Sequence, residues 1–388
     1  MRDSFLPLAL PVIGEAEVEE VIDSLRSGWL TTGPKTKKFE RLFRERLGVK
    51  HAVALSSCSA ALHLAMLALD IEPGDEIITT PVTWPATSNM IWHAGAKPVF
   101  VDIERDTLNI DAAKLEEAIT DKTRAIIPVH IAGQPCNMTE IHAVANTRGL
   151  PVIEDAAHAL GSTYKGVEVG ADGTHCCYSF YATKNMTTGE GGMFTTNDDE
   201  IAERVRVLSQ HGVSRDAWNR ERAQGPHWQL IEPGMKYNMS DLMSSIGIHQ
   251  MDRLDGFIAK RRELASEYDR MLKGFEGVTP LTRKPERASA FHLYIVRLNP
   301  EMLGATRDEL MIALREANIG VGVHFISTHL QPYYRERLGI APESLPVAAA
   351  LSEEILSLPI YPGMELSDVR DVVDAFRTVV AAQRAETT

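Results

Sequence analysis

A lysine in a turn of small residues is the side chain in this sequence best suited to nucleophilic chemistry. Lys184 lies in the segment SFYATKN (179–185), directly after an apolar run, and glycines follow at 189, 191 and 192. A lysine that is partly removed from water there has a pKa below its reference value of about 10.4, which favours the neutral, nucleophilic amine. Most lysines are simply solvated, so the argument depends on what surrounds Lys184.

A carboxylate and a histidine follow a second apolar run. Asp155 and His158 lie in EDAAH (154–158), where the segment PVIED (151–155) ends. A carboxylate in an apolar cleft stays ionised only if a cation, such as a protonated ring nitrogen, pairs with it. A cap for the helix after the strand is an equally good interpretation of this segment taken alone.

A third segment, SSCS (56–59), joins the run HAVAL (51–55) to an apolar helix. Its small side chains allow close approach to the backbone, and a helix N-terminus offers unpaired N–H groups to a phosphate. Taken alone, ordinary N-capping by Ser57 is the favoured interpretation, because such caps are common.

The segments that position these residues alternate between short β-rich runs and helical stretches. Strands are predicted at 51–55, 76–80, 98–102, 125–130, 151–155 and 176–181, and helices at 60–69, 111–119, 139–148 and 199–208. Strands separated by helices of 10 to 15 residues indicate an α/β fold with a mainly parallel sheet that is covered on both faces.

The C-terminal third predicts a second, smaller domain. A long helix is expected to begin at the N-cap Ser240 and to run towards Phe275. Strand-like runs at 292–298 and 320–325 flank a predicted helix at 307–317. We therefore predict a large domain over residues 1–250 and an α+β domain over residues 251–388.

Composition and missing motifs exclude several classes of protein. The net charge of −13 disfavours binding to nucleic acid or to an anionic membrane, and no apolar run reaches the ~18 residues of a membrane helix. The four cysteines form no CxxC pair, and with no secretory signal this favours a reduced, cytoplasmic protein. Motifs for NAD, a P-loop, a zinc protease or a serine hydrolase are missing. No metal site is expected, because His324 and His329 are five residues apart and Cys176 and Cys177 are adjacent.

The three segments together supply what pyridoxal 5'-phosphate (PLP) requires: an amine for a Schiff base, a carboxylate for the pyridinium nitrogen and a helix start for the phosphate. With these residues in place, the sequence resembles the DegT/StrS family of nucleotide-sugar aminotransferases over nearly its whole length. The matching segments are GWLTTGP (28–34), EDAAHA (154–159), SFYATKN (179–185), KYN (236–238) and GVHF (322–325). Within the family, Thr83-Trp84, IIPVH (126–130) and YYRER (333–337) most resemble the UDP-4-amino-4-deoxy-L-arabinose aminotransferases.

This resemblance implies PLP fold type I, the architecture of aspartate aminotransferase, and a role for each matching residue. Lys184 would form the Schiff base and then move protons, and Asp155 would hold the pyridine nitrogen protonated. His158 would lie beside the ring near its O3′ atom. Trp84 would stack on the ring, although packing in the core suits a tryptophan equally well.

The resemblance also implies how phosphate, partner and sugar are bound. Ser57, the backbone of Cys58, and Ser179 would bind the phosphate. Asn238 would reach the cofactor of a neighbouring subunit, which implies a homodimer with shared active sites. The sugar-nucleotide contacts would come from Thr31, His324, Phe325 and His329.

The activity that the resemblance implies is ping-pong transamination. Glutamate would give its amino group to the cofactor and leave as 2-oxoglutarate, and the 4-keto carbon of a UDP- or dTDP-linked sugar would then receive it. Such products feed lipopolysaccharide or another cell-surface polysaccharide. A C3 aminotransferase or another sugar aminotransferase of the family is the alternative, and a non-catalytic PLP-binding regulator is a weaker one. The related sugar dehydratases have histidine where this chain has Lys184.

Overall fold

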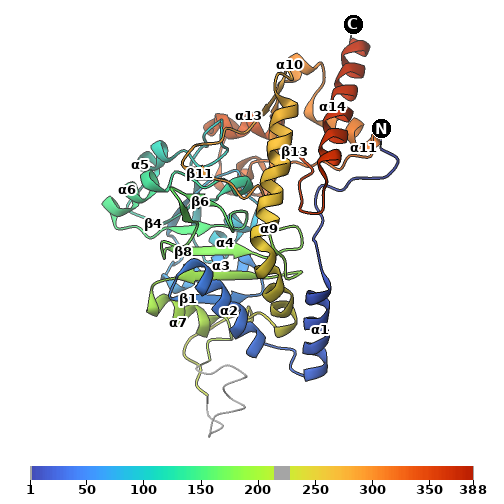
Figure 1. Ribbon diagram of the computed structural model, residues 1–388. Helices are drawn as coiled ribbons and strands as arrows, with labels where there is room; N and C mark the ends of the chain where they lie inside the picture. Colours follow the sequence, from blue (N-terminus) through green and yellow to red (C-terminus); the bar gives the residue numbers. More distant parts are fainter. Residues whose placement is uncertain (1, 214–227, 388) are drawn as a thin grey trace.

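The computed structural model describes residues 2–213 and 228–387, and its larger part is built on a mixed sheet (Figure 1). The strand order is β3-β2-β4-β5-β8-β9-β1, because isolated bridges pair Ile126 with Val152 and Val129 with Asp155 and so join β4 to β5. All neighbours are parallel except that β9 is antiparallel to both β8 and β1. The bounds are β1 His51–Leu55, β2 Glu76–Thr79, β3 Lys97–Phe100, β4 Thr123–Ile127, β5 Ile153–Asp155, β8 His175–Ser179 and β9 Gly192–Thr196.

Helices cover both faces of this sheet, and alternate strand residues pack against each layer. Cys177 packs in a core cluster with residues of the largely buried α3, whereas Cys176 packs in another cluster with Phe39 of α2. The helices of this part are α1 Glu15–Ser27, α2 Pro34–Leu47, α3 Cys58–Ala68, α4 Ala86–His93, α5 Leu115–Ala118, α6 Met138–Arg148 and α7 Asp199–Leu208. The mainly parallel α/β sheet predicted from the sequence is thus confirmed.

Two local predictions in this part differ from the structure. The helix expected at 111–119 is only a 3-10 turn, Ala112–Lys114, followed by the single turn of α5. Strand β9 was not predicted, because it follows directly on a glycine-rich stretch that has no strand pattern. Its antiparallel direction makes the sheet mixed rather than wholly parallel.

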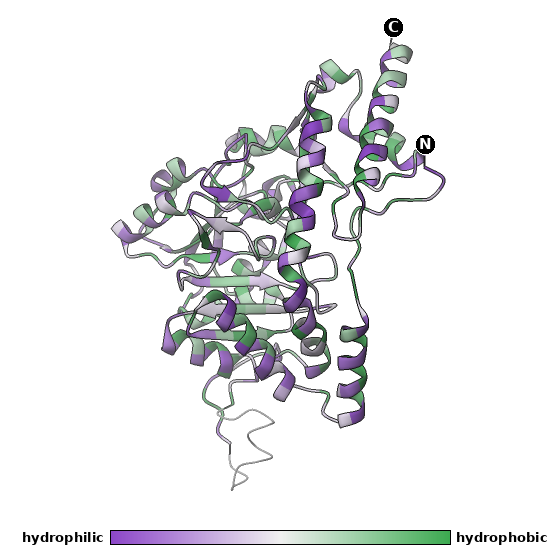
Figure 2. Ribbon diagram, viewed as in Figure 1, coloured by the Kyte–Doolittle hydropathy of each residue, from purple (hydrophilic) through white to green (hydrophobic). Residues whose placement is uncertain are grey.

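The long helix α9, Asp241–Leu272, connects the two parts of the molecule (Figure 1). Its predicted N-cap is confirmed, since the hydroxyl of Ser240 accepts a hydrogen bond from Met243 N–H at 3.3 Å. Residues of α9 up to Ile258 join the core around α2, whereas Leu264 and later residues join a separate core with α11 and α14. In Figure 2 the outer helices α1 and α9 carry both hydrophilic and hydrophobic bands.

The smaller part is an antiparallel sheet, β10-β12-β13, with helices packed on it. Leu6 lies in the same core cluster and pairs with Ile319, so the N-terminal segment belongs with this part in space. The bounds are β10 Val278–Pro280, β12 Tyr294–Leu298, β13 Ile355–Leu358, α10 Pro300–Leu303, α11 Arg307–Glu316, α12 Pro332–Leu338, α13 Pro346–Glu354 and α14 Leu366–Thr387. A domain division at residue 250 stays a prediction.

The strand predicted at 320–325 is wrong. Gly320 N–H donates to Leu6 O, and Gly322 forms an isolated bridge with Ser357, so the backbone pairs with two different partners in three residues. The segment then leaves the sheet and lines a cavity with Val323, His324 and Phe325.

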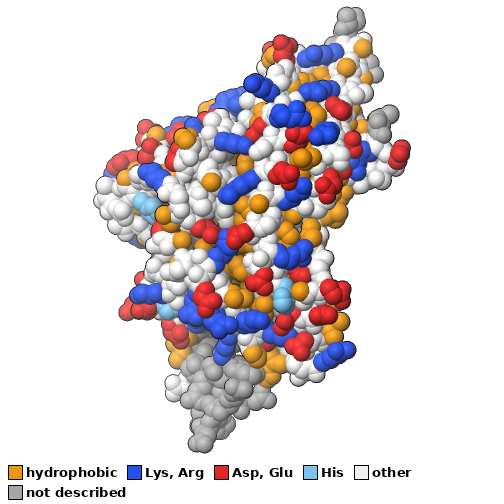
Figure 3. All heavy atoms as spheres, in the orientation of Figure 1, with side chains coloured by type: hydrophobic (Ala, Val, Ile, Leu, Met, Phe, Trp, Pro, Cys, Tyr) orange, Lys and Arg blue, Asp and Glu red, His pale blue; other side chains and the backbone are white. Residues whose placement is uncertain are grey.

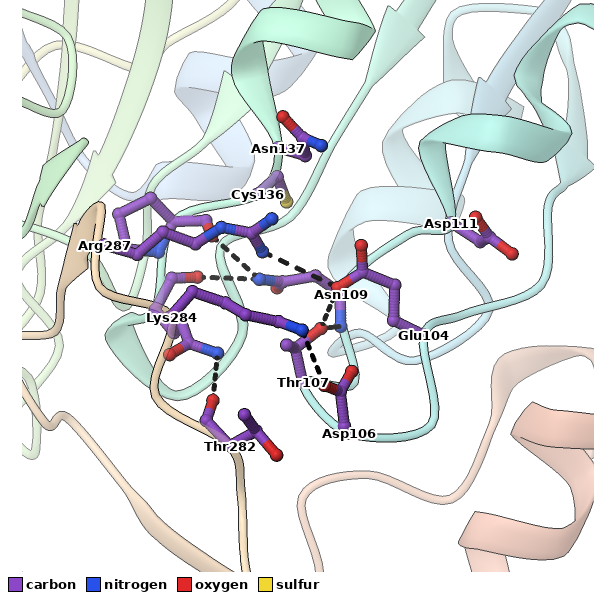
Figure 4. Close-up of polar contacts among 12 residues, drawn as sticks. Glu104, Asp106, Thr107, Asn109, Asp111, Cys136, Asn137, Thr282, Lys284 and Arg287 are labelled. Carbon is purple, nitrogen blue, oxygen red and sulfur yellow. Dashed lines mark hydrogen bonds and ion pairs between the residues drawn. The ribbon is translucent and has the colours of Figure 1, made fainter. Parts of the chain in front are cut away.

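Polar contacts fasten the segment after β10 to the loop after β3 (Figure 4). Lys284 Nζ lies 2.7 Å from Asp106 Oδ2, and the buried Arg287 lies 3.6 Å from Glu104 Oε2. The backbone at 287–288 (β11 Arg287–Ala288) pairs with β6 Thr163–Tyr164, which in turn pairs with β7 Val167–Glu168. These contacts hold the chain that leads to His292 against the large part.

The surface shows mixed charge on the face seen in Figure 3, where basic and acidic side chains intermingle along α9 and α14. Across residues 2–213 and 228–387, the helices are too short or too polar for any of them to traverse a lipid bilayer.

Candidate active site

The ends of β1, β5 and β8 meet at one edge of the sheet, because these three strands run in the same direction. Open α/β sheets bind ligands at this edge. A cavity of about 510 Å³ opens there. Nine of the residues predicted from the sequence line it: Ser57, Cys58, Trp84, Asp155, His158, Ser179, Lys184, His324 and Phe325.

Lys184 follows β8 and lines the cavity with a partly buried side chain. Its backbone N–H donates to Tyr181 O at 2.9 Å, which closes the tight turn that directs the chain back along the sheet. Desolvation lowers the pKa of Lys184 from 10.5 to about 8, and the charge of Asp155 opposes this effect. The amine is therefore neutral over an accessible pH range, as a nucleophile and proton carrier must be.

Asp155 ends β5 and is buried, and both of its carboxylate oxygens accept hydrogen bonds. Thr87 Oγ1 donates to Oδ2 at 2.7 Å, and Ala157 N–H donates to Oδ1 at 3.1 Å. Burial raises the pKa of Asp155, whereas these two donors and the nearby Lys184 act to lower it. A positive ring nitrogen placed in the cavity would add a further interaction that favours the carboxylate.

The start of α3 forms another wall of the cavity. Ser57 is the N-cap and its Oγ accepts from Ala60 N–H at 3.0 Å, which leaves its own hydroxyl proton free to donate to an anion. Gly192 of β9 packs against this turn so tightly that an added Cβ would lie 2.3 Å from Ser57 C and 2.5 Å from Cys58 N. The capping and phosphate-binding interpretations of this segment are therefore compatible.

Aromatic rings gather beside His158. Its ring centroid lies 4.3 Å from that of His292 and 5.9 Å from that of Phe325, and Trp84 lies 5.9 Å from Phe325. Desolvation and the charge of Lys184 hold the pKa of His158 well below its usual value, so this ring is neutral. Its Nδ1 has no hydrogen-bond partner within the described part of the chain.

His324 enters the cavity from the small part, and its Nδ1 lies 2.8 Å from the hydroxyl of Ser357. Desolvation, with the charge of Lys184, lowers the pKa of His324 to about 4. Neutral His324 therefore presents a hydrogen-bonding group, rather than a charge, to the cavity.

Three predicted residues lie outside this cavity. Thr31 is exposed, and its carbonyl accepts from Asp241 N–H at 3.1 Å. Asn238 donates to Thr32 Oγ1 at 2.5 Å, so Thr31 and Asn238 lie in one neighbourhood, and Asn238 and Thr32 line a different hollow from the cavity that contains Lys184. His329 is fully buried, with Nε2 3.4 Å from Pro342 O, and the structure does not bring it to the cavity.

Thr87 and His292 are among the cavity-wall residues to which the sequence assigned no role. Thr87, in the first turn of α4, is the direct side-chain partner of Asp155, and nothing in its local sequence distinguishes it from an ordinary helix residue. His292 begins a predicted strand, and nothing in its local sequence distinguishes it from a packed core histidine.

One group resembles a metal site in outline. Ligand atoms of His142, Glu154 and Asp172 lie within 4.8 Å of one another. Glu154, however, already accepts from Thr174 at 2.5 Å and pairs with His130 at 2.7 Å. Because Cys136 N–H donates to His130 Nδ1, the ring proton of His130 is on Nε2, and Nε2–H donates a hydrogen bond to Glu154. The absence of a metal stays a prediction.

An amine, a buried carboxylate and a helix N-terminus at the edge of a seven-stranded mixed sheet define a PLP-dependent enzyme of fold type I. The residues fit the group: the amine suits its aldehyde, the carboxylate its ring nitrogen, and the unpaired His158 Nδ1 leaves a polar atom for it to satisfy. The family model of the DegT/DnrJ/EryC1/StrS aminotransferases matches residues 11–377. The chain belongs to this family.

Several relatives support this assignment. The spore coat polysaccharide biosynthesis protein SpsC of Bacillus subtilis is 48% identical over 382 residues, 98% of both chains. The UDP-4-amino-4-deoxy-L-arabinose–oxoglutarate aminotransferase of Shewanella sediminis is 46% identical over 386 residues, 98% of this chain and 99% of that one. The PLP form of Spr1654 from Streptococcus pneumoniae has a TM-score of 0.90 at 34% identity, covering 98% of this chain and 99% of that one. The protein is thus a PLP-dependent sugar aminotransferase, and the predicted fold class, enzyme class and cofactor are confirmed.

Proposed function

We propose that this enzyme transfers an amino group from glutamate to the 4-keto carbon of a UDP- or dTDP-linked sugar, in two half-reactions that share one cofactor. The observation that carries the proposal is that Lys184 and Asp155, 29 residues apart in sequence, line one cavity together with the start of α3. Bound PLP supplies an aldehyde with which amines condense and a ring that withdraws electrons.

The residues of the cavity divide this work among them. Asp155 keeps the ring nitrogen protonated, since its ionised carboxylate accepts that proton's hydrogen bond. Lys184, with its pKa at about 8, takes a proton from the amino-acid Cα and returns it to the cofactor side, and it reverses this path for the sugar. Neutral His158 would lie beside the ring of bound PLP, and Ser57, Cys58 N–H and Ser179, which line the same cavity, would hold its phosphate.

The open side of the cavity suits a sugar. Trp84, which is expected to stack on the cofactor ring, is 63% exposed and packs against Phe325, so these two rings border the open side of the cavity. His324 adds a neutral hydrogen-bonding group for a hydroxyl. Discrimination between sugars would depend on such polar groups, because an unmatched hydroxyl leaves them unpaired.

The relatives favour a 4-amino sugar for a surface polysaccharide. One relative is named for UDP-4-amino-4-deoxy-L-arabinose and another for spore coat polysaccharide biosynthesis. The experiment is to convert the enzyme to its amino form with glutamate and then to offer 4-keto and 3-keto sugars on UDP and dTDP. Return of the PLP absorbance with only a 4-keto sugar is expected, whereas return with only a 3-keto sugar contradicts the C4 assignment. No response to glutamate would favour a regulator.

We further propose a homodimer in which Asn238, with the Thr31 loop beside it, completes the site of the partner. Asn238 does not line the cavity of its own chain, and its Oδ1 is buried without a hydrogen-bond partner in the described ranges. Mixing inactive Lys184→Ala subunits with weakened Asn238→Ala subunits tests this. A mixed dimer should regain one intact site, whereas additive activities of the two parents would contradict sharing. The expected cytoplasmic location stays a prediction.

A further inference from the structure

Two threonine hydroxyls form a chain that ends on the Asp155 carboxylate. Thr87 Oγ1 lies 2.7 Å from Asp155 Oδ2, and Thr83 Oγ1 lies 2.8 Å from Thr87 Oγ1. Both threonines are about 98% buried, and both line the cavity at the turn that leads into α4. The chain therefore connects α4 to the end of β5 beneath the cofactor site.

The negative charge of the Asp155 carboxylate, where the chain ends, sets which group donates in each hydrogen bond. An ionised carboxylate only accepts, so the single hydroxyl proton of Thr87 must be given to Asp155. Thr87 then has only acceptor capacity left, and Thr83 must donate to it. Each donation polarises the next hydroxyl, which strengthens the bond that reaches the carboxylate.

The two oxygens of Asp155 thus have separate donors, and this fixes the plane of the carboxylate. Ala157 N–H occupies Oδ1 at 3.1 Å, and Thr87 occupies Oδ2. Burial favours the protonated carboxyl, and each of these donors favours the ionised one. Among the described residues, Thr87 is the one side chain that donates a hydrogen bond to Oδ2, and replacing it with a residue that has no hydroxyl would remove this bond.

We propose that Thr87, supported by Thr83, is a positioning residue that keeps the Asp155 carboxylate ionised and oriented for the ring nitrogen of PLP. This inference rests on the proposed role of Asp155. Neither threonine needs to contact the reacting atoms. Their effect is exerted wholly through the charge and orientation of Asp155.

Substitutions at positions 83 and 87 leave the other titratable groups around Asp155 unchanged. Lys184 and His130 act on its charge, Cys58 Sγ lies 4.0 Å from Oδ1, and Cys177 is the residue that pairs with Asp155 across β5 and β8. A comparison between two substitutions at position 87 therefore isolates the hydroxyl.

The test measures the dissociation constant of PLP from cofactor-depleted protein between pH 6 and pH 8.5. Thr87→Val keeps the size and removes the hydroxyl, so PLP binding should weaken about tenfold or more near neutral pH, the usual effect of losing a hydrogen bond to a charged group. The loss should grow towards pH 6, where protonation of Asp155 competes with cofactor binding. Thr87→Ser should restore binding, and Thr83→Val should weaken it less than Thr87→Val does.

A matched control is the neighbouring Ser88, whose buried hydroxyl has no hydrogen-bond partner in the described part of the chain. Ser88→Ala should leave both affinity and its pH dependence unchanged. Equal losses in Thr87→Val, Thr87→Ser and Ser88→Ala, accompanied by lower melting temperatures, would show a packing role and overturn the proposal. Should Thr87→Val fail to fold, unchanged affinity and pH dependence in Thr83→Val would also overturn it.

Asp155→Asn separates this inference from the proposed function. If Asp155→Asn binds PLP as tightly as the wild type, the role of Asp155 itself is wrong. If Asp155→Asn binds weakly while Thr87→Val binds normally at every pH, only the positioning role of Thr87 is wrong.

Discussion

Replacing Lys184 with methionine should make the cofactor-free protein more stable at neutral pH. Methionine has a similar length and no charge, so it fills the same space without the desolvation that lowers the lysine pKa from 10.5 to about 8. Each unit of pKa corresponds to about 1.4 kcal/mol, so this difference sets an upper limit of about 3.4 kcal/mol. The side chain keeps some solvent contact in the cavity, and we therefore expect a gain of about 1–3 kcal/mol at pH 7.

The pH dependence distinguishes this effect from a gain in packing. Between pH 8 and pH 10.5 the unfolded lysine holds a proton that the folded one has lost, so the stability of the wild type rises with pH in this window. Below pH 8 Lys184 is protonated in both the folded and the unfolded protein, so the full free-energy cost of burying its charge is present. The advantage of Lys184→Met should therefore fall to about a quarter of its pH 7 value by pH 10.

The assay is denaturant or thermal unfolding of the cofactor-free proteins at pH 7 and pH 10, at one protein concentration. The same change at the exposed Lys122 controls for the loss of a lysine as such, and it should give no comparable gain. An equal advantage for Lys184→Met at both pH values would refute desolvation as the cause. A less stable variant at pH 7 would refute the reasoning altogether.

The remaining predictions concern the cofactor. Lys184→Ala should abolish transamination because, of the residues that the structure describes, Lys184 is the one cavity-wall amine that could carry the proton, and measurable turnover in a coupled glutamate assay would contradict this. Asp155→Ala should retain PLP poorly and lose most activity, as measured by absorbance after dialysis, and wild-type retention would contradict it. Ser57→Ala removes the acceptor for Ala60 N–H, so it should cost about 1 kcal/mol of stability and weaken PLP binding. Ser57→Thr keeps the hydroxyl and serves as the control. Unchanged PLP affinity in Ser57→Ala would contradict a role for Ser57 in binding the phosphate.

The sequence was sufficient for the parallel strands and for most of the residues that line the cavity, because these depend on local patterns, but it missed β9. Asp155 ends β5, and Ser57 and Lys184 lie in the loops after β1 and β8, so parallel strands bring all three residues to the same edge. The N-cap at Ser240 was likewise readable from a single residue before a helical pattern.

The rest depends on contacts that no local pattern encodes. His292 reaches the cavity because the chain between β10 and β12 is fastened to the large part by Lys284 and Arg287. The segment at 320–325 is apolar enough for a strand, but its backbone partners come from Leu6 and Ser357, more than 30 residues away. His329 was carried over from the resemblance and is buried elsewhere.

Borohydride reduction of the PLP-loaded enzyme, followed by digestion and peptide mass mapping, tests the central claim most directly. Reduction fixes the cofactor to the amine that holds it, and the structure offers Lys184 as the lysine in the cavity wall. The account predicts one modified peptide that contains Lys184. A cofactor fixed to a different lysine, or a protein that takes up no PLP, would contradict it.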